Sequence, residues 1–244
     1  MSDRRLIRAI GVLESCFKEK FGTPRQPQLV PASRARLRIK PQFIPEQSLK
    51  GLSEFSHVWL LPYFHLNTNK AFVSTIHPPR LKGKTMGVFA SRSPHRPSPI
   101  GLSLARLLRV EGDTLYFSEI DLVDGTPILD LKPYIPAYDS VPEASPGWTA
   151  RAGARELAVE FSPEAREKAR RHELEDLVSQ VLRQDLRNPR DASQMRDGKP
   201  LACMLGDFDV RYEVREGTAR VLEIVPAPEE HAQKRRVPVP GELE

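Results

Sequence analysis

The chain has 244 residues, of which 39% are hydrophobic and 28% charged, a composition typical of a globular protein with one large domain or a main domain and an appendage. The longest apolar run, near residues 58–64, is too short to cross a bilayer, and Arg8 and Glu14 interrupt the apolar stretch near the N-terminus, so we expect neither a membrane span nor a secretory signal. Cys16 and Cys203 provide no disulfide framework, which favours a cytoplasmic protein.

Positive charge is concentrated in the first 100 residues. They hold 17 Lys and Arg against 5 Asp and Glu, a net charge of +12, whereas residues 101–244 hold 20 against 27, a net charge of −7. No acidic residue stands between Glu54 and Glu111, where eight basic residues occur. This imbalance is typical of a surface that binds phosphate groups, although a solvated basic face without a partner would give the same count.

Residues 1–148 read as short strands joined by rigid loops. The candidate strands are residues 37–40, 58–64, 86–90, 100–110, 114–123 and 128–131. The polar stretch 46–55 is compatible with a helical turn. One alternating apolar face runs along the fourth candidate strand, through Ile100, Leu102, Leu104, Leu108 and Val110. Because a turn at residues 111–113 follows, we expect an antiparallel hairpin there, and the repeated Pro and Gly punctuation indicates a sandwich or a closed barrel.

A second unit is expected after a linker rich in Pro, Ala, Ser and Gly at residues 142–154. Ser162-Pro163-Glu164 is a helix start, and an apolar stripe at helical spacing continues it as far as Asn188-Pro189. Residues 201–214 and 218–225 then predict a hairpin that the helix covers. The predicted organisation is a β-rich domain over residues 1–148, a small α+β domain over 149–226 and a disordered tail over 227–244.

Two stiff loops suggest a preorganised binding site. The segment 87–101 reads Gly-Val-Phe-Ala-Ser-Arg-Ser-Pro-His-Arg-Pro-Ser-Pro-Ile-Gly, and its three prolines fix φ and remove three backbone donors. Arg92 and Arg96 therefore project from a loop that loses little entropy when it binds an anion. The segment 121–134, Asp-Leu-Val-Asp-Gly-Thr-Pro-Ile-Leu-Asp-Leu-Lys-Pro-Tyr, places three carboxylates around a turn.

Several kinds of chemistry find no support in the sequence. There is no Gly-x-Gly, which disfavours the usual dinucleotide and phosphate-binding folds. The six histidines and two cysteines show no metal-ligand spacing, so we expect no metal and disfavour a metal-dependent phosphoester hydrolase. No nucleophile elbow holds Ser91, Ser93 or Ser98.

The order and spacing of several segments resemble the TsaA-like family, whose bacterial members are called TrmO. The segments are Lys18-Glu-Lys-Phe-Gly-Thr-Pro-Arg-Gln-Pro27, Gly51-Leu-Ser-Glu-Phe-Ser-His-Val-Trp59, Pro78-Pro-Arg-Leu81, and the loops 87–101 and 121–134. The resemblance covers residues 8–148, and Asp207-Phe-Asp-Val-Arg211 is similar to the family's C-terminal appendage.

The resemblance implies a mainly β protein, with an antiparallel β-barrel catalytic domain and a small C-terminal α+β domain. It implies a homodimer that uses S-adenosylmethionine to methylate the N6 nitrogen of threonylcarbamoyladenosine, next to the anticodon of threonine tRNA. The alternative function is a non-catalytic RNA-binding module on the same barrel. Neither reading requires a membrane or a metal.

Carried over motif by motif, the resemblance implies a set of cofactor-binding residues: Arg25, Gln26, Pro27, Phe64, His65, Arg92, Leu102, Asp124, Gly125, Thr126 and Pro127. Structural roles are open for three groups of them. Arg92 could form an ion pair with Asp121 or Asp124. Residues 124–127 could be only a tight turn, and Phe64 and His65 could be packed at the end of a strand.

The attacking nitrogen is bonded to a carbamoyl carbonyl and is a poor nucleophile until its proton is shared or lost, so some polar group should accept that proton. Tyr134 and Asp139 are the candidates, and Lys132 is a candidate partner for the threonyl carboxylate; a tyrosine that caps a barrel corner is the structural alternative. Arg96, Arg187 and Arg190 are expected to contact tRNA, although a solvated linker would also explain the last two.

Overall fold

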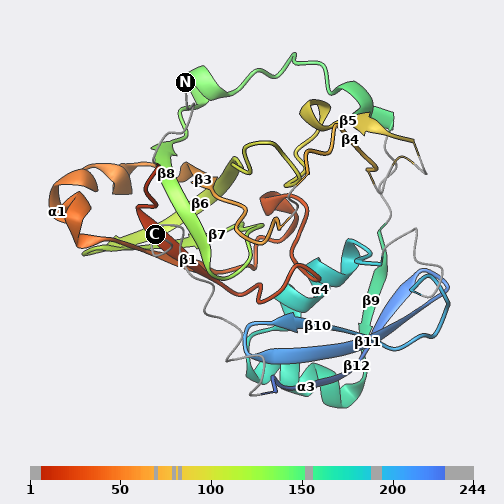
Figure 1. Cartoon of the computed structure of the whole chain (residues 1–244). Helices are drawn as coiled ribbons and strands as arrows, with labels where there is room; N and C mark the ends of the chain where they lie inside the picture. Colours follow the sequence, from red (N-terminus) through yellow and green to blue (C-terminus); the bar gives the residue numbers. More distant parts are fainter. Residues whose placement is uncertain are drawn as a thin grey trace.

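Six antiparallel strands close into a barrel, in the order β1-β2-β7-β6-β3-β8 (Figure 1). The structure, a computed structural model, describes residues 7–68, 71–78, 81, 84–151, 156–187 and 194–228. The barrel strands are β1 (Gly11–Ser15), β2 (Ala35–Ile39), β3 (His57–Pro62), β6 (Ser103–Glu111), β7 (Thr114–Ser118) and β8 (Thr126–Pro133). Fully buried side chains such as Leu13, Leu37 and Leu60 fill the interior. The predicted antiparallel barrel is confirmed.

The buried face of β6 is not the alternating apolar face that the sequence shows. Ser103, Ala105 and Leu107 are buried, whereas Leu102 is 56% exposed and Leu108 is 43% exposed. The β3–β6 register pairs Leu60 with Ser103 and Val58 with Ala105, so small residues of β6 lie beside large residues of β3. A six-stranded barrel has little interior space, and small side chains opposite large ones fill it. The apolar alternation of β6 therefore marks its outer face.

Antiparallel pairing sorts the connections into two groups at opposite ends of the barrel. Strands β1, β3 and β7 end where β2, β6 and β8 begin, so the three connections 16–34, 63–102 and 119–125 leave and re-enter the barrel at one end, and we call their described residues the loop end. The first of these connections contains η1 (Pro27–Leu29), and the second contains β4 (Thr75–Ile76), β5 (Met86–Gly87) and η5 (Val88–Ala90). Only the first part of the strand predicted over 86–90 is extended, because residues 88–90 turn into a 3-10 helix.

The opposite end of the barrel, which we call the turn end, holds the connection from β2 to β3 and the tight turn between β6 and β7. The first contains η2 (Pro41–Phe43), α1 (Pro45–Ser48) and η3 (Leu52–Glu54), which agrees with the helical turn predicted within residues 46–55. The chain also leaves β8 at this end, through α2 (Pro136–Asp139).

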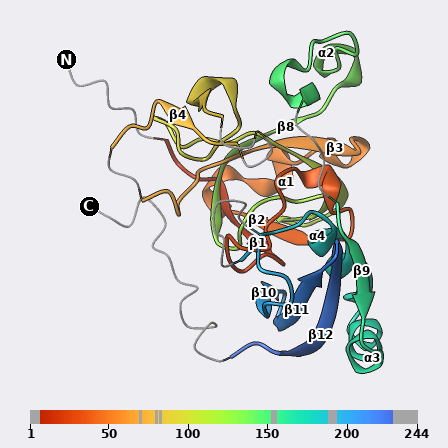
Figure 2. The ribbon, with the colours of Figure 1, turned by 90° about the vertical axis from the view of Figure 1, so that its right-hand side faces the viewer.

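Residues 134–148 form an arm that runs from the turn end back toward β4 and β5 (Figure 1). Figure 2 shows α2 standing away from the barrel wall. The arm is anchored near its far end, where η6 (Gly147–Arg151) begins and the Trp148 Nε1 group donates a hydrogen bond of 2.7 Å to the Ala90 carbonyl. The arm therefore connects the two ends of the barrel along its outside.

The second unit is a four-stranded sheet, ordered β10-β11-β12-β9, with helices on it. Its elements are β9 (Ala158–Phe161), α3 (Pro163–Arg171), α4 (Glu175–Arg183), β10 (Leu201–Leu205), β11 (Phe208–Arg215) and β12 (Thr218–Pro226). Ser162 caps α3 as predicted, by accepting a 3.0 Å hydrogen bond from the Ala165 amide.

Two predicted elements of the second unit are each divided in the structure. The single predicted helix becomes α3 and α4, because Glu173 adopts a left-handed φ of 56° that a continuous helix does not allow. The predicted strand 201–214 becomes β10 and β11, which turn at Gly206 with a φ of 58°. The four-residue strand β9 was not predicted and pairs parallel with β12.

The second unit is joined to the barrel next to the loop end. The Gly206 amide donates to the Cys16 carbonyl at 2.7 Å, and Phe17 forms a β-bridge with Leu205. The Ala32 amide donates to Gln180 Oε1 at 2.8 Å. Buried side chains of both units belong to one apolar cluster. Within the described part of the chain, no helix is long and apolar enough to cross a membrane.

Candidate active site

The residues assigned to the cofactor by resemblance all lie at the loop end. Arg25, Gln26 and Pro27 come from the connection after β1, and Phe64, His65, Arg92 and Leu102 come from the connection after β3. The remaining residues, 124–127, lie at the start of β8. Strand order thus places three segments that are far apart in sequence at one end of the barrel.

Arg92 and Gln26 contact each other across two of these connections. The Arg92 Nη1 group donates a hydrogen bond of 2.8 Å to Gln26 Oε1, and Gln26 Nε2 donates to the Arg25 carbonyl at 2.6 Å. Arg92 is exposed and forms no ion pair with Asp124, whose carboxylate binds elsewhere. The contact fixes a cationic side chain at the loop end without neutralising it.

The turn at Asp124 is firmly anchored to the end of β1. Asp124 Oδ1 accepts a 2.7 Å hydrogen bond from the Ser15 amide, and Oδ2 lies 3.1 Å from Lys18 Nζ. The Asp124 and Gly125 amides donate hydrogen bonds to backbone carbonyls in and just after β1. Gly125 has a φ of 79°, which suits glycine. The Asp124 carboxylate is therefore occupied by the protein, and the turn offers backbone carbonyls to a ligand.

Phe64 packs against glycine rather than standing free. The Phe64 amide donates to the Pro99 carbonyl at 2.7 Å, and the Gly101 amide donates to the Pro62 carbonyl at 2.8 Å. A Cβ atom at Gly101 would lie 2.5 Å from Phe64 Cζ. Glycine at this position thus lets the aromatic ring lie against the backbone that leads into β6.

Replacing Gly101 with alanine should displace the Phe64 ring and weaken ligand binding at the loop end. Overpacking of this kind costs about 1–3 kcal/mol. Thermal denaturation should show a lower midpoint for this variant. The control is Gly112→Ala, in the turn between β6 and β7. A Cβ atom there meets no atom within 4 Å, so this variant measures only the cost of a side chain at a positive φ. An unchanged midpoint for Gly101→Ala would show that the ring is not confined there.

His65 lies beside the turn at the start of β8. Its Nε2 atom is 3.9 Å from the position of a Cβ atom at Gly125, and its amide donates to the Tyr63 carbonyl. Burial lowers the pKa of His65 below its ordinary value, and the charge of Lys20 acts in the same direction. His65 is therefore neutral near pH 7 and offers a hydrogen-bonding ring without a charge.

Arg96 stabilises the proline-rich loop from within. Its Nη1 group donates to the Ser91 carbonyl at 2.8 Å and to the Val88 carbonyl at 3.3 Å, and its guanidinium lies 5.9 Å from the centre of the Phe89 ring. The Ser91 hydroxyl also donates to the Val88 carbonyl, at 2.8 Å. The stiffness expected from proline is thus reinforced by side-chain hydrogen bonds.

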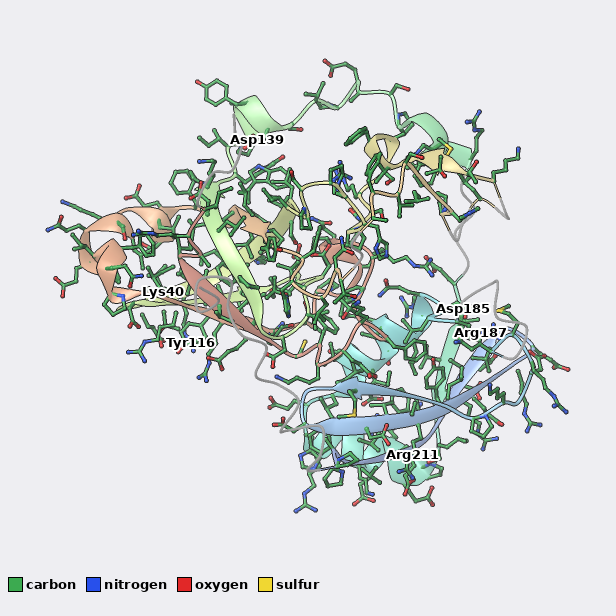
Figure 3. All side chains as sticks on the ribbon, in the orientation of Figure 1. Lys40, Tyr116, Asp139, Asp185, Arg187 and Arg211 are labelled. Carbon is green, nitrogen blue, oxygen red and sulfur yellow. The ribbon has the colours of Figure 1, made fainter. Side chains whose placement is uncertain are left out.

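Arg187 does not occupy a position from which it can contact tRNA. Its side chain is only 2% exposed and pairs with Asp185 through two hydrogen bonds, of 2.8 and 3.0 Å (Figure 3). A buried guanidinium that already binds a carboxylate presents no donor edge to a phosphate, which corrects the prediction for Arg187. Arg190 lies outside the described residues.

The residues predicted for proton transfer lie at the turn end. The eight residues of β8 precede Tyr134, so Tyr134 lies about 26 Å along the strand direction from the start of that strand. Tyr134 packs edge-on against Trp59, with ring centres 5.8 Å apart. Asp139 accepts a 2.7 Å hydrogen bond from the Ile135 amide and so caps α2 (Figure 3), and Lys132 pairs with Asp130 at 2.9 Å. Within one chain, these three residues do not reach the cofactor-binding set.

Asp121 is a residue of the loop end that was considered only as an ion-pair partner. Its Oδ1 atom accepts a 2.5 Å hydrogen bond from Ser103 Oγ. Burial raises the pKa of the Asp121 carboxyl from 3.8 to about 6, although the Ser103 hydroxyl and the charge of Arg92 act in the opposite direction. The position of Asp121 in the acidic block was visible in the sequence, but its burial depends on contacts made by folding.

A hollow of about 430 Å³ lies beside the loop end, lined by residues of β1, β2, β6 and β7 and of the turn at Gly206. Lys18, Arg34, Arg36, Arg109 and Tyr116 are among the residues that line it, and none of the predicted cofactor-binding residues does. The Arg109 guanidinium lies 3.7 Å from the centre of the Tyr116 ring. Among the described residues, no group of His, Cys, Asp and Glu side chains is arranged to hold a metal ion.

Comparisons with known proteins agree with the arrangement of two units. The family model of the tRNA-methyltransferase O N-terminal domain matches residues 12–140, and that of the TrmO C-terminal domain matches residues 154–227. A tRNA (adenine(37)-N6)-methyltransferase of Escherichia coli is 39% identical over 229 residues, which cover 89% of this chain and 96% of that protein. A Pseudomonas aeruginosa protein, whose name ascribes to it S-adenosylmethionine-dependent methyltransferase activity, is 42% identical over 227 residues, with the same two coverages.

The fold agrees with solved structures as well. A crystal structure of TrmO from P. aeruginosa has a TM-score of 0.77 and 39% sequence identity, and the match covers 93% of this chain and 99% of that chain. Both family models, the relatives over nearly their full length and the barrel topology therefore lead to one conclusion: this chain belongs to the TrmO family of tRNA methyltransferases.

Proposed function

We propose that this chain is an S-adenosylmethionine-dependent enzyme that methylates the N6 nitrogen of adenosine 37 in tRNA. The observation that carries the proposal is the convergence of every motif residue assigned to the cofactor at the loop end of one barrel. The names of the relatives from E. coli and P. aeruginosa support the reaction and the methyl donor. Following the resemblance, the substrate is threonylcarbamoyladenosine beside the anticodon of threonine tRNA.

The residues at the loop end fit the chemical groups of S-adenosylmethionine. When bound, this molecule supplies a methyl group activated by a positively charged sulfur. Arg92 offers a guanidinium for a carboxylate, with Gln26 holding it in place. Leu102, exposed at the edge of β6, offers an apolar contact for an adenine ring, and the turn at residues 124–125 offers carbonyl acceptors.

Arg92→Ala should weaken S-adenosylmethionine binding by about tenfold to a hundredfold, because a hydrogen bond to a charged group contributes about 1.5–3 kcal/mol. Isothermal titration calorimetry measures the affinity. Arg38→Ala is the matched control, since Arg38 is an exposed arginine toward the turn end that pairs with Asp113. Equal affinity for the Arg92 variant and the wild type would place the cofactor elsewhere.

We also propose a homodimer. The arm contains apolar side chains that the chain itself does not cover, with Tyr138 83% exposed and Val141 57% exposed. Phe89, on the loop that the arm reaches, is 74% exposed. A second copy of the chain is the partner proposed for these surfaces. Sedimentation analysis should give twice the mass of the chain.

The two units are assigned different roles in the proposal. Residues 1–148 carry the transfer, and residues 149–226 assist tRNA binding from their position beside the loop end. Arg96 contributes mainly by holding the loop that presents Arg92, given its hydrogen bonds to loop carbonyls. A substrate in the anticodon region of tRNA is consistent with a cytoplasmic enzyme.

The test of this function is transfer in vitro. Purified protein, S-adenosylmethionine and threonine tRNA bearing threonylcarbamoyladenosine should yield a nucleoside heavier by one methyl group, detected by mass spectrometry. The same tRNA without the threonylcarbamoyl group is the control for the substrate. Binding of tRNA without any methylated product would favour the alternative, a non-catalytic RNA-binding module.

A further inference from the structure

Asp121 occupies an unusual place among the residues of the loop end. It lies in the connection between β7 and β8, three residues before the anchored turn. Ser103, which is buried beside the exposed Leu102, donates a hydrogen bond to its Oδ1 atom at 2.5 Å, and Arg92 lies within electrostatic reach. Asp121 is thus close to two members of the cofactor-binding set, on β6 and on the proline-rich loop.

The Asp121 carboxylate is poorly compensated compared with other partly buried carboxylates of the chain. Asp124 binds a backbone amide and Lys18, and Asp185 binds Arg187 through two hydrogen bonds. Within the described residues, the Oδ2 atom of Asp121 accepts no hydrogen bond from another residue and forms no ion pair. A half-buried carboxylate that receives one hydroxyl donor besides its own amide is costly to the fold, which points to a role in the reaction.

The reaction requires a proton acceptor at this end of the barrel. The N6 nitrogen of the substrate carries one hydrogen and is conjugated with the carbamoyl carbonyl, so its proton must leave as the new bond forms. A group that accepts this proton must lie within hydrogen-bond reach of the nitrogen. Of the acceptors considered from the sequence, Tyr134 and Asp139 lie at the turn end and Asp139 is bound to the Ile135 amide.

We propose that Asp121 is the proton acceptor of the methyl transfer, an inference that rests on the proposed function. The Oδ2 atom takes the proton from N6. The N6–H bond breaks as the bond between N6 and the methyl carbon forms, and the carbon–sulfur bond breaks with its electron pair left on sulfur. Ser103 fixes the orientation of the carboxylate through the other oxygen.

The pH dependence of the enzyme should reflect the environment of this carboxyl. Its raised pKa of about 6 makes Asp121 a stronger base than an ordinary aspartate, while it is still ionised near pH 7. The charged group that acts on this carboxyl is Arg92, whose positive charge lowers its pKa. Turnover should fall as the pH drops through about 6, because protonated Asp121 accepts no proton.

The first experiment replaces Asp121 with asparagine, which keeps the shape and the acceptor for Ser103. Turnover of threonylcarbamoyl tRNA should fall by about 10²- to 10⁴-fold, the usual contribution of a general base. S-adenosylmethionine affinity, measured by calorimetry, should stay within a few-fold of the wild type, which excludes a loss caused by misfolding. Asp113→Asn, on an aspartate in the turn between β6 and β7 whose side chain is 30% exposed, is the matched control and should keep full turnover.

Ser103→Ala provides a second test, because its expected result would not follow from a purely structural role of Asp121. The Ser103 hydroxyl lowers the pKa of Asp121, so its removal should move the acidic limb of the pH profile to higher pH. A carbon-13 NMR titration of the Asp121 carboxyl should show a midpoint near 6 in the wild type and a higher midpoint in the variant.

Three results would overturn the inference: wild-type turnover by Asp121→Asn, an acidic limb that Ser103→Ala leaves unmoved, or an ordinary aspartate midpoint in the NMR titration. A wild-type protein without activity would overturn the proposed function as well. The wild-type assay alone distinguishes this outcome from a failure of the Asp121 proposal. Active wild type with an active Asp121→Asn variant overturns the role of Asp121 alone.

Discussion

Replacing Arg187 with leucine is expected to lower the free energy of unfolding by about 3–5 kcal/mol. Arg187 and Asp185 are both buried and joined by two hydrogen bonds. Removal of the guanidinium takes both of these hydrogen bonds away from the buried Asp185 carboxylate, which is far more costly than the loss of a surface pair. Urea denaturation followed by circular dichroism measures the change.

The matched control is Arg211→Leu. Arg211 also pairs with acidic residues, Asp209 and Glu223, but its side chain is 51% exposed (Figure 3). Exposed pairs contribute about 0–1 kcal/mol, so this variant should be nearly as stable as the wild type. The double variant Asp185→Leu with Arg187→Leu should recover much of the loss, because no buried charge is left. Equal effects of Arg187→Leu and Arg211→Leu would contradict this account of Arg187.

Replacing Asp121 with asparagine is expected to increase the free energy of unfolding near neutral pH, by about 3 kcal/mol. The pKa of this carboxyl is about 6 in the folded chain and 3.8 ordinarily, a difference of about two units, each worth about 1.4 kcal/mol. Since the folded pKa is the higher one, the folded state disfavours the ionised carboxylate. The neutral amide removes that penalty and still accepts the hydrogen bond from Ser103.

The pH dependence of this gain has a definite sign. The penalty on the wild type is fully present above the folded pKa of about 6, and it disappears as the pH falls toward 3.8. Denaturation at about pH 7.5 should therefore show a larger gain for Asp121→Asn than denaturation at about pH 5. A variant that is less stable than the wild type at about pH 7.5 would mean that Asp121 stabilises the fold and is not held there for the reaction.

Strand alternation and Pro and Gly punctuation predicted a sandwich or a closed barrel, and the family resemblance favoured the barrel, but neither identified the inward faces of the strands. The outer face of β6 carries Leu102 and Leu108, and its inner face carries Ser103 and Ala105. The apolar alternation of β6 therefore marks the side that faces away from the barrel interior. β1 was missed because Leu13 is the only large apolar residue on its buried face, between Gly11 and Ser15.

The part of the candidate site that carries family motifs could be predicted from the sequence. The cofactor-binding set lies at one end of the barrel, as its motifs imply for a single site. The positions of Tyr134 and Asp139 at the other end could also have been inferred, because a predicted strand at residues 128–131 separates them from Asp124. The burial of Arg187 and Asp121 could not, since it depends on neighbours brought together only in the folded chain.

The most direct test of the central claim is a crystal structure of the protein with S-adenosylmethionine. The account predicts that the ligand lies at the loop end, with its carboxylate near Arg92, in contact with the turn at residues 124–127 and with its methyl group facing Asp121. Ligand bound instead in the hollow lined by Arg36 and Tyr116, or at the turn end beside Tyr134 of the same chain, would contradict it.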